Sequence, residues 1–228
     1  MIVAVSSVLN EADIIAKTIV HLKAQGVDEV LISDGGSTDG TRDLLVKHAD
    51  GYVLQDGPFD QGKEITHLAH LAREQGADWV IPFDADEFWI DPLGTTVAEV
   101  LYALPDTTSH VFAATYGHLD WTRRLPQKPL SKVCFRPQPG MVVAWGNHHV
   151  NGITGDAIHG VLEIRELQYR DWDHFLAKVE KARALFASWA VPLEHGHHMR
   201  RLTEMTDQQL ADEWANYQSQ PSTHAPIT

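Results

Sequence analysis

Cysteine is nearly absent from this sequence, and so is any long apolar run. The single cysteine, Cys134, excludes an internal disulfide and is typical of a protein kept in a reducing compartment. No stretch reaches about 18 consecutive apolar residues, so we expect no membrane span. The chain starts in the strand-like run IVAVSSV without a basic segment before it, so we expect no signal peptide. These features together predict a cytoplasmic protein.

Basic residues are also scarce. Lys and Arg number 18 against 31 Asp and Glu, which gives a formal net charge of −13. Such a chain has little attraction for nucleic acid or anionic lipid, and an anionic ligand would need a bound cation. The phosphate-binding patterns GxxxxGK[ST] and GxGxxG are both missing, because the glycine-rich segment DGGSTDG at 34–40 fits neither. Something other than glycine amides must hold any diphosphate.

Strand-like and helix-like segments alternate through roughly the first hundred residues. Val- and Ile-rich runs predict buried strands at 2–8, 28–34, 51–56 and 78–84. Apolar residues at helical spacing predict helices at 11–25, at 41–48 and from Asp60 to Gly76. This alternation predicts an α/β fold with a parallel sheet covered by helices on both faces.

The pattern changes beyond residue 105. Short strands separated by Pro and Gly turns are predicted at 110–119, 130–137, 141–145 and 157–164, as a mixed extension of the sheet. A strongly amphipathic helix is predicted from Asp171 to Trp189. The tail from about Ser219, SQPSTHAPIT, is expected to be disordered.

Polar segments follow each of the four predicted parallel strands. They are SVLNEAD, DGGSTDGT, DGPFDQGK and DADEF. Ligands of open parallel sheets bind outside the carboxyl ends of the strands, so these segments are expected to share one edge and one ligand.

The acidic segment DADEF is the most specific of them. In an extended chain, residues i and i+2 project to the same side, so Asp84 and Asp86 are expected to face one ligand. Two carboxylates about 4 Å apart repel by roughly 4 kcal/mol at an effective dielectric near 20. A divalent cation bound between them makes the net interaction favourable. Oxygen ligands with open positions suit Mg²⁺ or Mn²⁺. The simpler alternative is a solvated acidic loop at the end of a strand.

Three segments, in this order, resemble the nucleotide-sugar half of family 2 type glycosyltransferases with the GT-A fold. They are VSSVLNEAD, LISDGGSTDGT and DWVIPFDADEFW, and the branch that carries DxDEF is the most similar one. KVCFRP (132–137), GNHHV (146–150) and YRDWDHFLAKV (169–179) resemble later motifs of that branch. The similarity covers roughly residues 2–190.

The resemblance implies a metal-dependent enzyme that moves a sugar from a nucleotide-diphosphate sugar to an acceptor hydroxyl, with Mn²⁺ or Mg²⁺ as cofactor. Residues 1–104 would be the nucleotide-sugar-binding half and 105–190 the half that completes the acceptor and metal sites. Residues 191–228 would add a helix and a flexible tail.

The resemblance also implies a set of donor-binding residues. Asn10 and Glu11, with Ser6 and the neighbouring Ser7, would line the nucleoside pocket, and Asp34 would accept a hydrogen bond from the base. Lys63 would approach the ribose or the diphosphate, and its alternative is an ordinary solvated side chain. Arg170 and Lys178 would neighbour the phosphates, where a cation stabilises a departing diphosphate, and ordinary helix-surface charge is the alternative.

The metal ligands implied by the resemblance are Asp86 as the direct ligand and Asp84 facing the ribose or the water shell of the ion, with Glu87 orienting its neighbours. A histidine from the distal part of the chain would be the third ligand. GNHHV offers His148 and His149, which would point to opposite faces of a strand, and we prefer His148. Satisfaction by a backbone carbonyl is the alternative for either ring.

Other positions depart from the family pattern or carry less signal. Glu166 stands where the related proteins often have His, and Asp171 replaces a common Ser. Asp156 is our candidate for the carboxylate that deprotonates the acceptor, with Glu163 and Asp120 behind it, and inversion and retention both stay open. The histidine cluster EHGHHM (194–199) is interpreted as a surface or acceptor-side loop.

Two other classes of protein compete with this interpretation. A nucleotidyltransferase would also pair aspartates with Mg²⁺, but its basic glycine-rich loop is missing near the start of the chain, where SVLNEAD has no base before Lys17. A non-catalytic sugar-binding protein would keep Trp89, Trp121 and Trp145 for stacking, yet it would not need the acidic pair.

Overall fold

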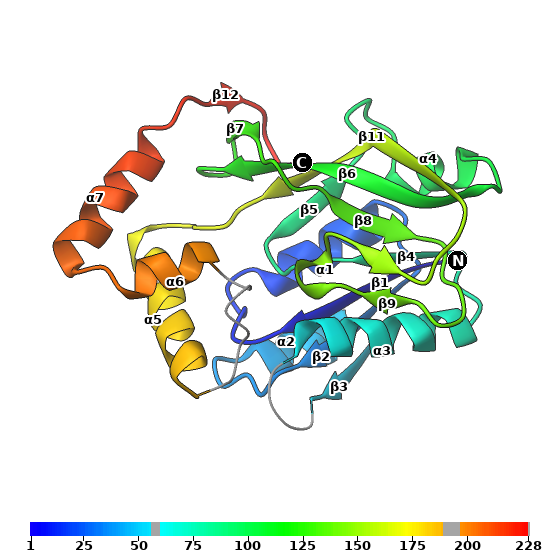
Figure 1. The fold of residues 1–228 in the computed structure, drawn as a ribbon, viewed down its shortest axis with the longest axis horizontal. Coiled ribbons are helices and arrows are strands. Elements are labelled where there is room, and N and C mark those ends of the chain that lie inside the picture. The colour runs from blue at the N-terminus through cyan, green and yellow to red at the C-terminus, as the bar shows by residue number, and fades with distance from the viewer. Residues whose placement is uncertain (56–59, 189–196, 228) are drawn as a thin grey trace. The chain divides into compact units, whose positions relative to one another are not determined.

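A computed structural model describes residues 1–55, 60–188 and 197–227 (Figure 1). The chain forms two compact units. The first comprises residues 1–116 and 127–166, and the second comprises residues 117–126 and 167–228.

The first unit is built on a sheet that is parallel at its core. Its strands, in spatial order, are β3 (Gly51–Leu54), β2 (Glu29–Asp34), β1 (Ile2–Val8), β4 (Trp79–Pro82), β8 (Lys132–Phe135) and β6 (Thr108–His118). The first four run parallel to one another, whereas β8 is antiparallel to both β4 and β6. The predicted parallel sheet with a mixed extension is therefore confirmed.

Helices cover both faces of this sheet. They are α1 (Ile15–Ala24), α2 (Thr41–His48), α3 (Gln61–Glu74) and α4 (Val97–Ala103). All seven residues of β1 are buried, which requires cover on both faces because neighbouring side chains alternate. On one face, α3 packs against Val3, Val5 and Val80. The helix α4 was not predicted.

A segment from the distal half of the chain packs against α3. This segment contains β9 (Val142–Val143), the 3₁₀-helix η1 (Trp145–Asn147) and β10 (Val150–Asn151). Thr66 accepts a hydrogen bond from the Val143 amide at 2.9 Å, and His70 lies 3.1 Å from the Met141 carbonyl oxygen. The GNHHV motif is thus fixed against the helix that follows the third parallel strand.

A second pair of strands continues from the acidic segment. The short strand β5 (Glu87–Ile90) pairs antiparallel with the end of β11 (Asp156–Glu166), and β11 also pairs with β6. Glu87 and Glu166 are cross-strand partners in this register. The start of DADEF therefore lies at the end of a parallel strand, and its end lies in an antiparallel ribbon.

The second unit is mainly helical and has an aromatic core. It contains α5 (Trp172–Ser188), α6 (His197–Thr203), α7 (Asp207–Gln218) and β12 (Thr223–His224), with the end of the hairpin between β6 and β7 (Arg123–Gln127). Its buried residues are Tyr169, Phe175, Val179, Leu202 and Leu210. The predicted helix from Asp171 to Trp189 corresponds to α5.

The tail differs from the disordered segment that the sequence predicts. Strand β12 pairs antiparallel with β7, with Thr223 opposite Arg124. Beyond it, the amides of Ala225 and Ile227 donate to the carbonyls of Thr122 and Trp121. Backbone pairing of this kind does not depend on side-chain hydrophobicity, so composition does not reveal it.

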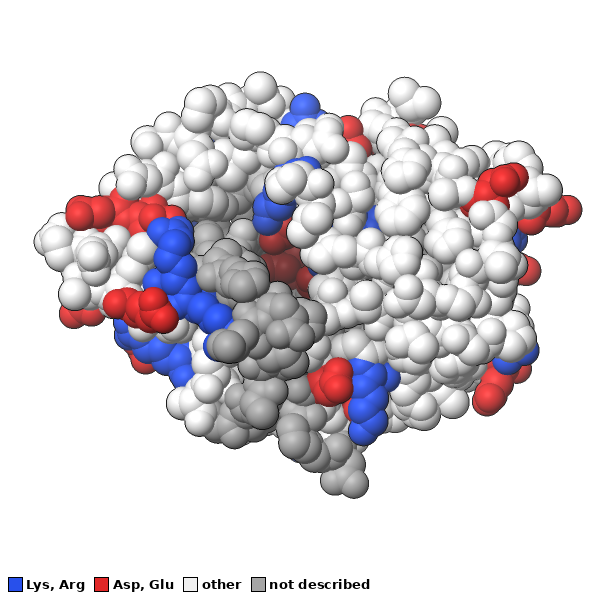
Figure 2. Space-filling model, viewed as in Figure 1, with Lys and Arg blue, Asp and Glu red and all other residues white. Residues whose placement is uncertain are grey.

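On the face shown in Figure 2, basic and acidic side chains are interspersed, and acidic atoms also lie recessed below the surface near the centre of the view. Within the described ranges, no helix combines the length and the apolar character needed to cross a bilayer.

Candidate functional site

A tight turn lies at the carboxyl end of β4. The Asp84 amide donates to Oε2 of Glu87 at 3.0 Å, and the Glu87 amide donates back to the Asp84 carbonyl at 3.0 Å. The segment therefore turns at Ala85 and Asp86 instead of continuing as a strand, and the expected i, i+2 alternation of Asp84 and Asp86 does not apply. Asp86 is only 7% exposed.

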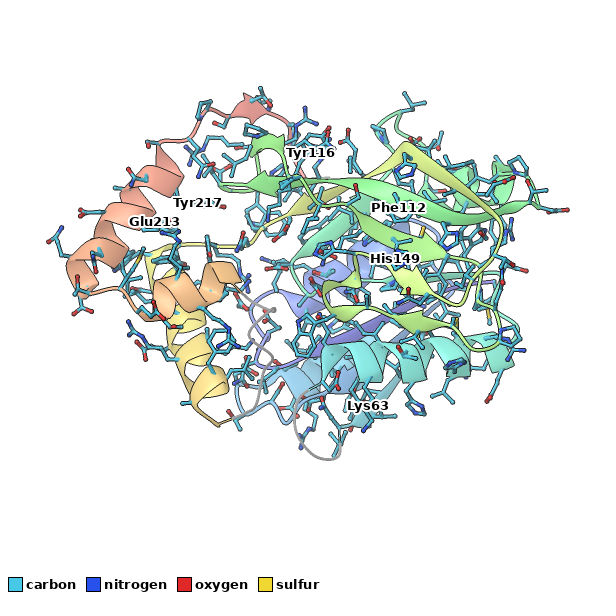
Figure 3. The ribbon with its side chains drawn as sticks, in the orientation of Figure 1. Lys63, Phe112, Tyr116, His149, Glu213 and Tyr217 are labelled. Atoms are coloured by element: carbon cyan, nitrogen blue, oxygen red, sulfur yellow. The ribbon has the colours of Figure 1, made fainter. Side chains whose placement is uncertain are left out.

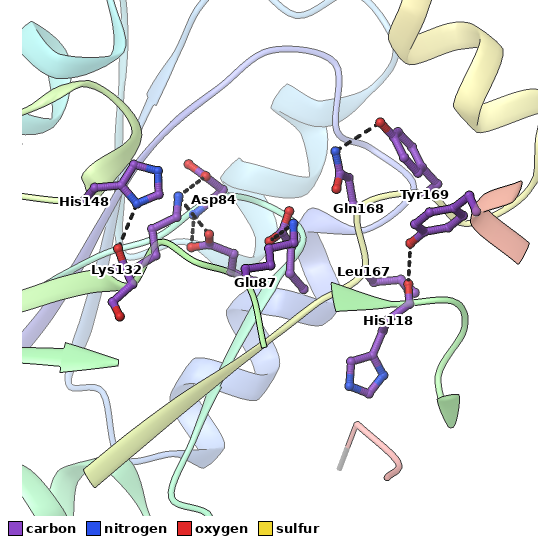
Figure 4. Close-up of polar contacts among 12 residues, drawn as sticks. Asp84, Glu87, His118, Lys132, His148, Leu167, Gln168 and Tyr169 are labelled. Atoms are coloured by element: carbon purple, nitrogen blue, oxygen red, sulfur yellow. Dashed lines mark hydrogen bonds and ion pairs between the residues drawn. The ribbon is translucent and has the colours of Figure 1, made fainter. Parts of the chain in front are cut away.

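Three donors from distant parts of the first unit hold the Asp84 carboxylate. Gln61 on α3 and Asn147 on η1 donate to Oδ1, at 2.8 and 3.2 Å. Nζ of Lys132, the first residue of β8, lies 2.6 Å from Oδ2 (Figure 4). The side chain of Asp84 remains 32% exposed. Its orientation is fixed while one edge still faces solvent.

Lys132 also pairs with Glu87. Its Nζ lies 2.9 Å from Oε1 of Glu87, and the two side chains are 7% and 1% exposed. Burial raises the pKa of Glu87 to about 8 against the opposing effect of Lys132. Burial acts to lower the pKa of Lys132, but Asp84 and Glu87 raise it above its ordinary value. One ammonium ion faces two carboxyl groups, so Lys132 stays charged and Glu87 takes up a proton first.

A second lysine and carboxylate lie beside this group. Nζ of Lys128 is 2.6 Å from Oε2 of Glu166, the cross-strand partner of Glu87. The Glu166 side chain is 15% exposed. The departure from the family pattern at position 166 thus places another carboxylate next to the acidic turn, and it is balanced by its own lysine.

His148 and His149 have different surroundings. Nδ1 of His148 lies 2.8 Å from the carbonyl oxygen of Ser131 (Figure 4), so Nδ1 carries the hydrogen and Nε2 is left as an acceptor. Burial lowers the pKa of His148, which keeps the ring neutral at neutral pH. His149 is exposed (Figure 3). The pair follows η1 rather than lying in a strand, and the charges of Lys132 and Asp84 act on His148.

The loops after β1 and β2 are joined by hydrogen bonds. The Asn10 amide donates to Ser37 Oγ at 2.9 Å, and Oδ1 of Asn10 accepts from the Thr38 amide at 2.8 Å. The Glu11 amide donates to Oγ1 of Thr41 at 2.8 Å. Asn10 adopts a positive φ of 53°, as suits an asparagine at a turn. The structure therefore brings SVLNEAD and DGGSTDGT together, as the sequence predicts.

Two predicted donor-binding residues are buried. The Ser6 hydroxyl is inaccessible and donates to the Phe83 carbonyl at 2.7 Å. Asp34 is fully buried, accepting from the Ser37 amide at 2.9 Å and from Nε of Arg42 at 3.0 Å. Burial opposes the effect, but these donors lower the pKa of Asp34 below its ordinary range. Both side chains hold strands and loops in place here, and neither lines an open surface.

The predicted cations lie in different parts of the fold. Lys63 is exposed in the first turn of α3 (Figure 3), where its amide donates to the N-cap residue Asp60 at 3.0 Å. Arg170 and Lys178 belong to the second unit. There they donate to the carbonyls of Leu167 and Gln168, at 3.3 and 2.9 Å. Their roles toward phosphate stay predictions.

The three candidate bases belong to other elements, Asp156 and Glu163 to β11 and Asp120 to the second unit. Asp156 and Glu166 lie at opposite ends of β11, so about ten residues at 3.3 Å each put Asp156 roughly 30 Å from the turn. The structure therefore does not bring Asp156 to the turn, and its role as the base stays a prediction. Glu163 is ion-paired with Arg165 at 3.0 Å. The pKa of Asp120 is held far below its ordinary range by hydrogen bonds, despite some opposing burial, which suits a cap and not a base.

Residues 56–59, at the start of DGPFDQGK, lie outside the described residues, as do Glu194 to Gly196 of the histidine cluster. The remaining part of that cluster lies in α6.

The sequence interpretation missed Lys132, Gln61 and Asn147. A lysine inside the apolar strand KVCF is a signal, because a buried lysine needs a carboxylate partner. Asn147 is fully buried with a φ of 60°. Its position after Gly146 in GNHHV hints at a turn but not at its partner. Gln61 carries no signal of its own.

A comparison with known protein families gives a match to this chain. The family described as Glycosyl transferase family 2 matches residues 4–150, more than half of the 228 residues. The chain belongs to this family. Together with the sheet, family 2 membership confirms the predicted GT-A-like α/β fold class. No match was found among curated proteins.

Several solved structures are similar to this family 2 chain. Glucosyl-3-phosphoglycerate synthase from Mycobacterium tuberculosis, solved with Mn²⁺, UDP and glucosyl-3-phosphoglycerate, is 20% identical over 52% of this chain and 44% of that one, with a TM-score of 0.38. A mycobacterial protein is 25% identical over 51% and 41%, with a TM-score of 0.37. A Desulfovibrio desulfuricans G20 protein is 13% identical over 93% and 97%, also at 0.37. This chain thus matches less than half the length of the first two, and the family assignment rests on the sequence match.

Proposed function

We propose that this chain transfers a sugar from a nucleotide-diphosphate sugar to an acceptor hydroxyl and uses Mn²⁺ or Mg²⁺. The observation that carries the proposal is the position of DADEF. It lies at the carboxyl end of β4, within a family 2 match, and GNHHV and the loop after β1 belong to the same unit. The donor half would be residues 1–104, and residues 105–190 would bind the acceptor.

The side chains present suit a hard divalent cation. Asp84 and Asp86 supply carboxylate oxygens in one turn, which Glu87 orients, and Nε2 of His148 is an acceptor in the same unit. Among the described residues, however, no group of three or more His, Cys, Asp or Glu is arranged to hold an ion. Such a site fits a cation that completes its coordination with phosphate oxygens, as Mg²⁺ commonly does.

Each residue has a definite part in this proposal. Asp86 would hold the ion directly, with His148 as a further ligand, and Asp84 would orient the ribose or the water shell. Asn10 and Glu11 would contact the nucleoside. Bound metal supplies charge stabilisation to the departing diphosphate.

Lys63, Arg170 and Lys178 are the proposed phosphate neighbours. Asp156 stays the candidate for the carboxylate that would deprotonate the acceptor, with Glu163 and Asp120 behind it.

The test is release of nucleoside diphosphate from a panel of nucleotide sugars, with Mn²⁺ or with EDTA and without acceptor. Slow, Mn²⁺-dependent release from one donor is expected for a transferase. Asp86→Asn should reduce it at least about a hundredfold. Asp78→Asn is the matched control, because Asp78 precedes the same strand at its opposite end and is 53% exposed. Pyrophosphate exchange would indicate nucleotidyl transfer, and binding without any release would indicate a sugar-binding protein.

A further inference from the structure

Lys132 places a positive charge at the acidic turn, and the proposed transfer reaction does not by itself require this charge. Its ammonium group lies 2.6 Å from Asp84 and 2.9 Å from Glu87 (Figure 4). We propose that Lys132 is a positioning residue that keeps the divalent ion from binding tightly until the diphosphate of the donor arrives. This inference rests on the proposed function.

The geometry of Asp84 gives the first reason. Gln61 and Asn147 both donate to Oδ1, and Lys132 donates to Oδ2. A carboxylate has about four lone-pair positions, and three of them are taken. The remaining position lies on the oxygen that already faces an ammonium ion. Asp84 is therefore a poor direct ligand as long as Lys132 stays in place.

The burial of Lys132 gives the second reason. Its side chain is 7% exposed, and the neighbouring residues Val133, Cys134 and Phe135 are fully buried. A lysine in these surroundings cannot turn toward solvent without leaving a carboxylate unpaired in the interior. The positive charge is thus a permanent part of the site, and it repels any divalent ion that approaches Asp84.

The charge around the turn gives the third reason. Glu166, the carboxylate opposite Glu87, is likewise paired with a lysine, Lys128, at 2.6 Å. The protein therefore offsets part of the negative charge of its acidic turn with its own lysines. An ion held there needs oxygen atoms from elsewhere, and a diphosphate supplies both oxygen and negative charge.

Mn²⁺ binding to the donor-free protein tests the inference. Mn²⁺ is titrated calorimetrically into the wild type, Lys132→Met and Lys132→Arg, each with and without UDP or GDP as the diphosphate probe. A unit charge about 6 Å from a divalent ion changes affinity about tenfold even at the dielectric of water. Lys132→Met should therefore bind Mn²⁺ alone at least about tenfold more tightly, and the diphosphate should enhance binding less than in the wild type. Lys132→Arg should stay within about threefold of the wild type.

The matched control is Lys23→Met, which removes a lysine from the remote Lys23–Asp50 ion pair of 2.6 Å and should leave Mn²⁺ affinity unchanged. Should Lys132→Met fail to fold, Lys132→Gln, which keeps a donor without the charge, provides the same comparison. Equal or weaker Mn²⁺ binding by the folded uncharged variant would overturn the inference. The titration needs no turnover, so it can fail or succeed independently of sugar transfer.

Discussion

Glu166 on β11 is the direct cross-strand partner of Glu87 on β5. Like charges in such a position are destabilising, and Lys128 on Glu166 offsets the repulsion. Lys128→Met should lower the free energy of unfolding by about 1 kcal/mol, because Glu166 then faces Glu87 without its cation. The double variant Lys128→Met/Glu166→Gln should have a free energy of unfolding within about 0.5 kcal/mol of the wild-type value. Urea denaturation of the two single variants and the double variant at pH 9, above the Glu87 pKa of about 8, measures this coupling, and simple addition of the single effects would contradict it.

Arg42 and Asp34 predict a pH dependence. Hydrogen bonds from Ser37 and Arg42 outweigh burial and lower the pKa of Asp34. Since the unfolded value is about 3.9, this carboxylate stabilises the fold above that pH, and its contribution is lost as pH falls through the folded pKa. Arg42→Gln should lower the free energy of unfolding by about 1–2 kcal/mol at pH 7, and by progressively less below pH 4. Urea denaturation at pH 7, 5 and 3.5 checks this, and a cost that does not vary with pH would count against it.

Asn147 combines a left-handed backbone with a buried amide. Its φ is 60°, its amide donates to Asp84 at 3.2 Å, and its Oδ1 has no partner among the described residues. Asn147→Ala should lower the free energy of unfolding by about 2 kcal/mol, because the hydrogen bond is lost and because alanine disfavours this φ. Asn147→Gly loses the same bond without the conformational cost, so it should be about 1 kcal/mol more stable than the alanine variant. Thermal unfolding compares the two, and equal losses would show that the backbone is not strained.

Gly146 makes room for the imidazole of His148. A Cβ at this position would lie 2.9 Å from Cδ2 of the ring, and φ is 79°. Gly146→Ala should therefore displace His148 and weaken Mn²⁺ binding in the presence of UDP or GDP by about tenfold. Gly76→Ala is the control, because φ there is 88° with nothing within 4 Å of the added carbon. If both variants bind Mn²⁺ like the wild type, His148 is not a ligand.

The parallel half of the fold is predictable because its signals are local. Val-rich strands, helical stripes and the glycines Gly26 and Gly76 each act within a few residues, and the carboxyl ends of parallel strands meet by topology. The edge that carries SVLNEAD, DGGSTDGT and DADEF follows from these rules alone.

The remainder depends on pairings between distant segments. Lys132 and Asp84 are 48 residues apart, and no periodicity connects them. Asp156 follows the histidine pair closely in sequence, but β11 carries it away from the turn toward the opposite end of the strand. Glu166 at the other end of β11 lies beside Glu87 only because of the register with β5. Strand register and long-range pairing decide which residues meet at the site. A single sequence carries no local pattern that predicts these pairings.

The most direct measurement is the release of nucleoside diphosphate from the preferred nucleotide sugar by the wild type and Asp86→Asn, each with Mn²⁺ and with EDTA. The account predicts Mn²⁺-dependent release by the wild type, a loss of at least about a hundredfold in Asp86→Asn, and unchanged release by Asp78→Asn. Full activity of a folded Asp86→Asn protein, or release that EDTA leaves untouched, would contradict it.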